Sequence, residues 1–233
     1  MESISDDSSS WISSCFKTEE TFSFSKLRTE SSQRDYFRFN FQGKNFILMY
    51  APKGIDESIE SFCKKAEVFK SFQVKVPEIY FRNDDLCHLI IEDFSDNLFQ
   101  LTITQDNSDT LIKSALDQLI RIQNIGCDAD IFEHFDLDKS IANKDLFVDF
   151  FCRGYLNLSD ASIPFDTINE GYEFILKRFY ELPMCISHYD FETRNLIYLD
   201  SKETGVLDFQ DAMIAPYALD LASLIKDLYM VWD

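Results

Sequence analysis

The chain has 233 residues, of which 45% are hydrophobic, with 23 phenylalanines but only 6 glycines and 5 prolines. This composition indicates a packed globular protein and excludes a disordered one. The formal net charge of −19 argues against a nucleic-acid-binding surface, which would need a basic patch. Isolated cysteines, no signal-peptide pattern and no bilayer-length apolar run predict a soluble cytoplasmic protein without membrane or nucleic-acid partners.

The first third of the chain is predicted to be rich in β-strands. Residues 1–25 are expected to be loosely held, with a short helix near Trp11–Phe16. Strict alternation over Asp35–Phe41, a turn, and the apolar run Asn45–Ala51 predict a β-hairpin. The alternation places three aromatic side chains on one face of it, Phe37, Phe39 and Phe41.

A helix is predicted next, capped by Asp56 and presenting one apolar face: Ile59, Phe62, Cys63, Ala66 and Phe69. The segments Glu78–Arg82 and Cys87–Ile91 then predict a second strand pair. The polar segment Glu92–Asn97 is the best candidate for a linker between two lobes.

Helices dominate the remainder of the predicted structure. Asp109 can cap one helix, Asp145–Leu156 predicts a buried helix because it is apolar nearly all round, and Pro164 suits the first turn of another. Two short strands, Leu196–Leu199 and Val206–Phe209, precede a last helix from about Tyr217.

The pattern of greatest chemical interest is H-x-D-x-x-x-x-N at His188–Asn195, followed by a strand and Asp208. Phosphoryl transfer needs an oriented hydroxyl, a carboxylate near its proton, and cations on the triphosphate. Asp190 is spaced to accept that proton, while Asn195 and Asp208 offer the hard oxygens that Mg²⁺ prefers. We expect His188 to brace the loop rather than to react. The alternative is that these are ordinary polar residues of loops and strand ends.

Asp220 follows Pro216 and Tyr217 at the start of the last helix. Two interpretations are equally open at this stage. It is a first-turn carboxylate favoured by the helix dipole, or it accepts hydrogen bonds from the backbone of the catalytic loop.

Several segments together resemble the aminoglycoside phosphotransferase/choline kinase superfamily, and within it the kinases of N-acetylmuramate and N-acetylglucosamine. The segments that carry the resemblance are Ser31–Arg38, Ile47–Pro52, Val76–Ile79, Leu89–Phe94, His188–Leu196, Val206–Ala212 and Asp220–Leu224. Of these, D-F-Q-D-A at Asp208–Ala212 and I-L-M-Y-A-P at Ile47–Pro52 are the most specific.

The resemblance implies an α+β, two-lobed, protein-kinase-like fold, with a β-rich nucleotide-binding lobe over residues 1–94 and a helical lobe over residues 95–233. It implies ATP and Mg²⁺, with Asp190 as the catalytic base and Asn195 and Asp208 as metal ligands. The implied nucleotide-binding residues are Ser31, Ser32 and Arg34 over the phosphates, and the backbone of Glu92 and Phe94 at adenine.

Three departures from the family pattern bear on activity. Met49 occupies the strand position of the usual phosphate-binding lysine, as it does in the sugar-kinase subgroup, so Arg34, with Lys53 behind it, is the predicted replacement cation. Glu192 stands where the family has histidine, and a carboxylate there disfavours an anionic substrate such as muramate. The resemblance implies a helical lobe truncated at Asp233, and from this we expect self-association through its exposed end.

The predicted function is an ATP-dependent kinase that phosphorylates the anomeric hydroxyl of N-acetylmuramate or N-acetylglucosamine. One alternative changes only the acceptor, to another small alcohol or an aminoglycoside, which the acidic surface would suit. The other is a degenerate nucleotide-binding protein with incomplete activity.

Overall fold

The computed structural model describes residues 4–27, 33–54, 58–127, 131–136, 140, 144–200 and 202–228. The first lobe, here the sheet lobe, consists of α1 (Asp6–Phe16), β1 (Ser25–Lys26), β2 (Asp35–Phe41), β3 (Lys44–Tyr50), α2 (Ile59–Ser71), β4 (Ile79–Asn83) and β5 (His88–Glu92). The helical lobe consists of α3 (Phe99–Thr102), α4 (Ser108–Gln123), η1 (Phe147–Tyr155), η2 (Asp160–Ser162), α6 (Phe165–Tyr180), β6 (Met184–Ser187), β7 (Leu196–Tyr198), β8 (Thr204–Val206), η3 (Phe209–Asp211), β9 (Met213–Pro216) and α7 (Ala218–Ile225).

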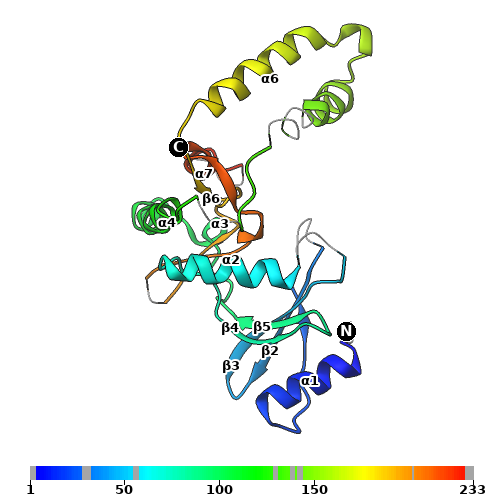
Figure 1. The fold of residues 1–233 in the computed structure, drawn as a ribbon, viewed down its shortest axis with the longest axis vertical. Helices are drawn as coiled ribbons and strands as arrows, with labels where there is room; N and C mark the ends of the chain where they lie inside the picture. The colour runs from blue at the N-terminus through cyan, green and yellow to red at the C-terminus, as the bar shows by residue number, and fades with distance from the viewer. Residues whose placement is uncertain are drawn as a thin grey trace.

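The sheet lobe is built on a five-stranded antiparallel sheet with the order β1-β2-β3-β5-β4 (Figure 1). The predicted hairpin is its centre, with β2 and β3 paired from Asp35↔Tyr50 to Phe41↔Lys44. Its two turn residues, Gln42 and Gly43, have φ of 51° and 81°. Two consecutive left-handed residues are typical of the tight turn whose twist matches that of paired strands.

The expectation of a loosely held N-terminus is wrong for α1, which packs against the sheet on the side away from α2 (Figure 1). Ile12 is fully buried there, and the Phe16 ring lies 4.7 Å from that of Phe41 and 5.0 Å from that of Phe46. The Ser8 hydroxyl also hydrogen-bonds His88 Nε2 at 2.8 Å. The aromatic face of the hairpin therefore gives this short helix a binding site, which burial of apolar area stabilises.

Helix α2 covers the other face of the sheet and contributes to the main core. It buries the predicted apolar side chains Ile59, Phe62, Cys63, Ala66 and Phe69. Its N-cap is Ser58, whose hydroxyl accepts from the Ser61 amide at 3.2 Å, and not Asp56, which lies outside the described residues. In α4 the N-cap is likewise Asn107, and the predicted cap Asp109 lies in the first turn.

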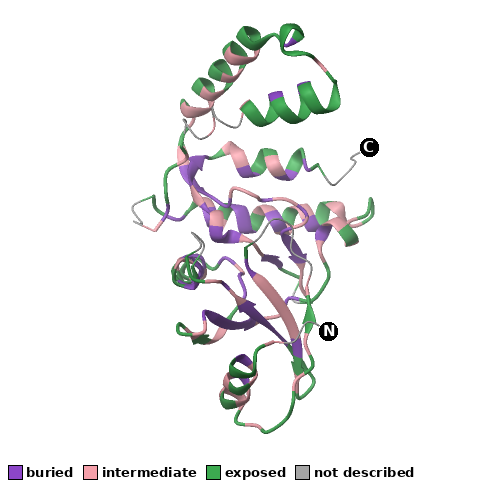
Figure 2. Ribbon diagram, turned by 90° about the vertical axis from the view of Figure 1, so that its right-hand side faces the viewer, coloured by how far each residue is buried: buried purple, intermediate pink, exposed green. Residues whose placement is uncertain are grey.

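The predicted buried helix at Asp145–Leu156 is instead largely exposed. It forms η1, a π-helix in which only Val148 and Cys152 are buried, while Phe150 is 74% exposed and Tyr155 is 77% exposed. Together with α6, which has no buried residue, η1 forms an arm that projects from the helical lobe (Figures 1 and 2). The apolar pattern was identified correctly, but no other described element packs around the arm to bury it.

The rest of the helical lobe places two strand pairs beside α4 and α7. Strands β6 and β9 pair antiparallel, as do β7 and β8, and the β7–β8 hairpin aligns Leu196 with Val206. Val206 also donates its amide to the Lys75 carbonyl at 2.8 Å, which joins this hairpin to the sheet lobe. Among the described residues, no helix is long and apolar enough to cross a membrane.

Candidate active site

The loop from His188 to Asn195 connects β6 to β7, and Asp208 follows β8. Because β7 and β8 form one antiparallel hairpin, the residues before the first strand and after the second lie at the same end. The Leu207 amide donates to the Asn195 carbonyl at 2.9 Å, which extends the pairing to the residue before Asp208. The hairpin therefore brings the two predicted metal ligands, Asn195 and Asp208, to one edge.

Asp220 anchors the start of this loop from the first turn of α7. Its side chain is 1% exposed and accepts from the His188 amide at 2.7 Å, the Tyr189 amide at 2.9 Å and the Ser187 hydroxyl at 2.8 Å. Burial raises the pKa of Asp220, and these donors oppose that effect because they stabilise the ionised form. Of the two interpretations left open by the sequence, this geometry matches the backbone-accepting one.

The His188 side chain joins the loop to the strand end that carries Asp208. Its ring is fully buried, packs edge-on against the Phe191 ring, and places Nε2 2.8 Å from the Leu207 carbonyl oxygen. This contact fits the expected bracing role. A ring held against a carbonyl in this way is not presented to a substrate.

Asn195 is held against Asp190 within the loop. Its side-chain amide donates to the Asp190 carbonyl at 2.9 Å, and its backbone amide donates to the Glu192 carbonyl at 2.9 Å. With the side-chain nitrogen bonded to the loop, its amide oxygen is the group left to reach a metal ion. The predicted base, Asp190, and the predicted metal ligand, Asn195, are thus held in a fixed relation to each other by hydrogen bonds to the loop backbone.

Two residues of the site adopt the left-handed conformation although neither is glycine. Tyr189 has φ of 80°, and Asp208 has φ of 59° with ψ of 37°. Such residues cost about 1–3 kcal/mol each and cluster at functional sites. Both flank the predicted chemistry, one before Asp190 and the other at the predicted metal ligand itself.

The charges of the site converge on Asp211, at the end of η3. Burial raises the pKa of Asp211, and the carboxylates of Asp208 and Asp190 raise it further. The cations of Lys65 and Arg34 lower it. Burial and the charges of Asp190 and Asp211 likewise raise the pKa of the Tyr189 hydroxyl. The loop that carries Tyr189 and Asp190 therefore lies close enough to the Asp208–Asp211 segment for their charges to interact.

The donor set of this edge fits Mg²⁺. Asp208 supplies a carboxylate, to which the Gln210 side chain donates, and Asn195 supplies an amide oxygen. In the described part of the chain, no three His, Cys, Asp or Glu residues are grouped to hold a metal alone. Mg²⁺ is usually held by one or two carboxylates together with substrate phosphates, and Asp208 with Asn195 would supply the protein's part of such a set.

Of the two predicted phosphate-side cations, Arg34 is buried near the site and Lys53 is exposed. Arg34 is 1% exposed, with its guanidinium 5.5 Å from the centroid of the Phe62 ring and close enough to act on Asp211. Met49 is fully buried in β3, and Lys53 is exposed. Ser31 and Ser32, predicted at the phosphates, lie outside the described residues. The sequence interpretation missed Lys65, a buried lysine of α2 that also acts on Asp211.

The predicted adenine side lies at the connection after β5. The Glu92 amide donates to the Glu78 carbonyl at 2.8 Å, so that N–H is already engaged in the sheet lobe. An open cavity of about 440 Å³ lies against this segment, lined by Lys75, Glu92, Asp93, Phe94, Ser95, Leu199, Asp200 and Glu203. The cavity does not include Asp190, Asn195 or Asp208, so it marks the hinge and not the site of chemistry.

Phe94 is held by a close approach to β8. A Cβ added at Gly205 would lie 2.6 Å from two carbons of the Phe94 ring, which is itself 5% exposed. We therefore expect Gly205→Ala to destabilise the protein by about 1–3 kcal/mol, because the largely buried ring would have to shift to relieve this contact. Urea unfolding measures this change.

Gly171→Ala is the matched control. Gly171 lies in α6 with nothing within 4 Å of an added Cβ, so alanine there should stabilise the helix by about 0.5–1 kcal/mol. An unfolding free energy that Gly205→Ala leaves unchanged would contradict the packing of Phe94 described above.

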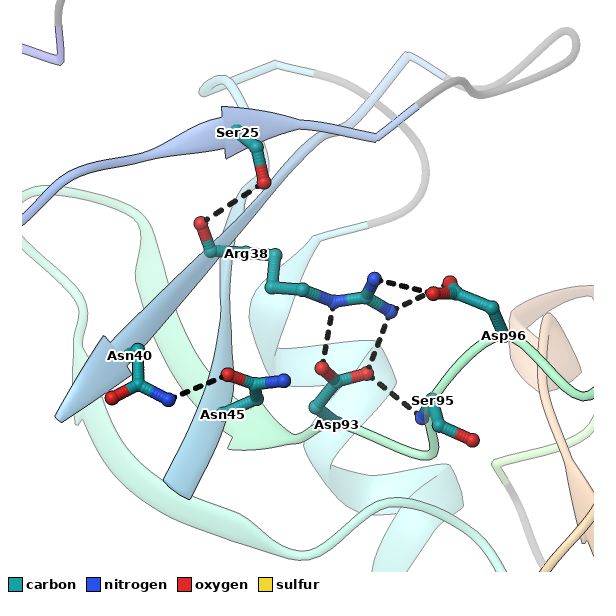
Figure 3. Close-up of polar contacts among 7 residues, drawn as sticks. All are labelled: Ser25, Arg38, Asn40, Asn45, Asp93, Ser95 and Asp96. Carbon is teal, nitrogen blue, oxygen red and sulfur yellow. Dashed lines mark hydrogen bonds and ion pairs between the residues drawn. The ribbon is translucent and has the colours of Figure 1, made fainter. Parts of the chain in front are cut away.

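A cluster of ionised side chains joins β2 to the hinge (Figure 3). The Arg38 guanidinium contacts Asp93 through Nε at 2.7 Å and Nη2 at 3.0 Å, and Asp96 through Nη1 at 2.7 Å and Nη2 at 2.8 Å. The Asp93 side chain is 5% exposed and also accepts from the Ser95 amide at 2.9 Å. The hydrogen bonds that the guanidinium donates to Asp96 and Asp93 raise the pKa of Arg38.

Arg38→Met is expected to destabilise the protein by about 1–3 kcal/mol, because it leaves the buried Asp93 carboxylate without its main donor. Asp96 contributes less, since its side chain is 77% exposed. Arg82→Met is the control, because Arg82 pairs with the exposed Asp84 two residues away. Chemical unfolding of both variants tests this prediction. Equal losses of unfolding free energy would show that the contact of Arg38 with Asp93 stabilises the protein no more than an exposed ion pair does.

Comparison with known proteins identifies the family of this chain. The sequence pattern of the phosphotransferase enzyme family matches residues 23–233. The chain therefore belongs to that family. It is 27% identical over 212 residues to an N-acetylmuramate/N-acetylglucosamine kinase of Pseudomonas putida, which covers 90% of this chain and 61% of that protein. The kinase of the same name from Neisseria meningitidis serogroup B is 25% identical, covering 96% of this chain and 66% of its own.

Solved structures of the phosphotransferase type share the fold. An ADP-bound aminoglycoside phosphotransferase, APH(2'')-Ib, superposes with a TM-score of 0.68 at 17% identity, over 94% of this chain and 75% of that chain. The choline kinase LicA from Streptococcus pneumoniae gives a TM-score of 0.63 at 16% identity, over 94% and 73% of the two chains. The predicted family and the two-lobed α+β kinase-like fold are both confirmed. The residue roles remain predictions.

Proposed function

We propose that the protein is an ATP-dependent kinase that transfers the γ-phosphoryl group to an alcohol of a small molecule. The observation that carries this proposal is the joining of the loop around Asp190 to the strand end at Asp208. That joining uses the Asn195 side chain, the Leu207 amide and the His188 ring. Family membership and fold support the same reaction class.

In this proposal Asp190 accepts the proton of the attacking hydroxyl. Asp220 holds the start of the loop through two backbone amides, so Asp190 meets the acceptor in a fixed orientation. Asn195 and Asp208 hold Mg²⁺, which when bound spreads charge from the phosphoryl oxygens. Arg34 would lie on the phosphate side. The backbone of Glu92 and Phe94 would face adenine, apart from the Glu92 amide, which already donates to the Glu78 carbonyl.

The proposed acceptor is the anomeric hydroxyl of N-acetylglucosamine or N-acetylmuramate. The names of the curated relatives support this choice, although this chain spans only 61–66% of the two described. Glu192 pairs with the Arg194 guanidinium within the loop, and burial raises the pKa of Glu192. Its carboxylate leads us to expect the uncharged N-acetylglucosamine to be the better of the two substrates.

The six cysteines are all free, which supports action in a reducing compartment such as the cytoplasm, where ATP is available.

ADP release in the presence of ATP and Mg²⁺ tests the proposal. The acceptor panel is N-acetylglucosamine, N-acetylmuramate, choline and an aminoglycoside. Turnover that depends on either N-acetylated sugar supports the whole assignment. Turnover only on the aminoglycoside, which the net charge of −19 would favour, keeps the reaction and replaces the acceptor. Bound ATP without turnover on any acceptor would overturn the enzyme proposal in favour of a nucleotide-binding protein.

A further inference from the structure

One face of α2 combines two aromatic side chains with a lysine. Phe62, Lys65 and Phe69 follow one another at spacings of three and four residues, which places them on the same side of a helix. All three are buried, with Lys65 at 8% exposure. Among the lysines of the described segments, Lys65 alone is buried. This face packs on η3, which directly follows the predicted metal ligand Asp208.

The packing around Lys65 is aromatic and specific. The Phe209 ring of η3 lies 4.8 Å from the Phe62 ring and 5.5 Å from the Phe69 ring. The Lys65 ammonium donates a hydrogen bond to the Gln210 carbonyl and lies 5.9 Å from the centroid of the Phe132 ring. Lys65 therefore links a helix of the sheet lobe directly to the backbone beside Asp208.

A buried ammonium group is costly unless opposite charge or hydrogen bonds compensate for it. For Lys65, the compensating groups belong to the segment that follows Asp208: the Gln210 carbonyl and the Asp211 carboxylate. Lys65 lowers the pKa of Asp211, whose carboxylate is also influenced by Asp208 and Asp190. The Gln210 side chain in turn donates to the Asp208 carboxylate. Lys65 thus balances negative charge at the place where an anionic triphosphate would have to approach.

On the side of the sheet that faces α2, the neighbouring strand β3 presents the uncharged Met49, which is fully buried. We propose that Lys65 is a positioning residue for phosphoryl transfer, holding the Asp208–Asp211 segment against α2 and offsetting its negative charge so that nucleotide phosphates can bind. This inference rests on the proposed kinase function, and assigns to α2 a cation that acts through η3 rather than by touching the nucleotide.

The test compares three variants of the whole protein. Lys65→Gln keeps a hydrogen-bond donor but removes the charge, Lys65→Met removes both, and Lys64→Met is the control. Lys64 neighbours Lys65 in α2 but is exposed and pairs with Glu60 one turn away. Thermal unfolding first establishes which variants are folded, and Lys65→Gln decides the outcome if Lys65→Met does not fold.

The decisive measurement is ADP affinity by calorimetry, with and without Mg²⁺, together with kcat and KM for ATP. Lys65→Gln is expected to weaken ADP binding by at least about tenfold and to raise KM for ATP more than it lowers kcat. Lys64→Met should stay within about twofold of the wild type.

The outcomes separate the two proposals. A folded Lys65→Gln variant that binds ADP as tightly as the wild type would overturn the inference and leave the kinase proposal intact, because loss of charge alone would then have no effect. A wild-type protein that neither binds ADP nor turns over ATP would overturn both.

Discussion

Asp190→Asn is expected to lower turnover by about 10²–10⁴-fold, the range that proton transfer by a positioned group typically contributes. The substitution is nearly isosteric and leaves the backbone contacts of the loop in place, namely the Asn195 side chain on the Asp190 carbonyl and the two amides on Asp220. ADP affinity should therefore stay close to that of the wild type. Steady-state ADP release and calorimetric titration of ADP measure the two quantities separately.

Asp117→Asn is the matched control for this prediction. Asp117 is an exposed aspartate of α4 and does not line the cavity at the hinge. Its replacement should leave turnover unchanged. If Asp190→Asn retained wild-type turnover, the proton would have to go to another group, and Asp190 would lose its assigned role.

The sheet lobe could largely be predicted because its signals are local. Alternation over Asp35–Phe41 and the apolar face of α2 both specify which side of an element is buried. The arm formed by η1 and α6 shows the limit of such signals. An apolar pattern indicates that a segment favours burial, but whether a partner element is present to bury Phe150 or Tyr155 depends on the rest of the fold.

The part of the candidate site that could be predicted is the part set by spacing along the sequence. The motif placed Asp190 and Asn195 in one loop, and the short hairpin explains why Asp208 returns to the same edge. Lys65 was missed because a lysine beside another lysine in an amphipathic helix usually faces solvent. The available signal was its spacing from Phe62 and Phe69, which assigns Lys65 to the buried face and Lys64 to the outside.

Asp208 is expected to control the metal dependence of nucleotide binding. In the wild type, we expect Mg²⁺ to tighten ADP binding, because in the proposed site Asp208 and Asn195 would hold the ion together with the nucleotide phosphates. Asp208→Asn should remove most of that gain while leaving metal-free ADP binding equal or slightly tighter, since one negative charge is lost. Calorimetric titration of ADP with and without Mg²⁺ gives both values.

Asparagine is a better replacement than alanine at this position because of the backbone. Asp208 has φ of 59°, and asparagine adopts that conformation more readily than alanine does. Asp208→Ala should therefore lose the Mg²⁺ effect and in addition lose about 1 kcal/mol or more of stability. The two variants separate the metal ligand from the turn that holds it. If Mg²⁺ still tightened ADP binding to Asp208→Asn, the ion would be held by other oxygens. If that effect were lost in Asp208→Asn while Asp190→Asn kept its ADP affinity, the roles of metal ligand and base would belong to Asp208 and Asp190, respectively.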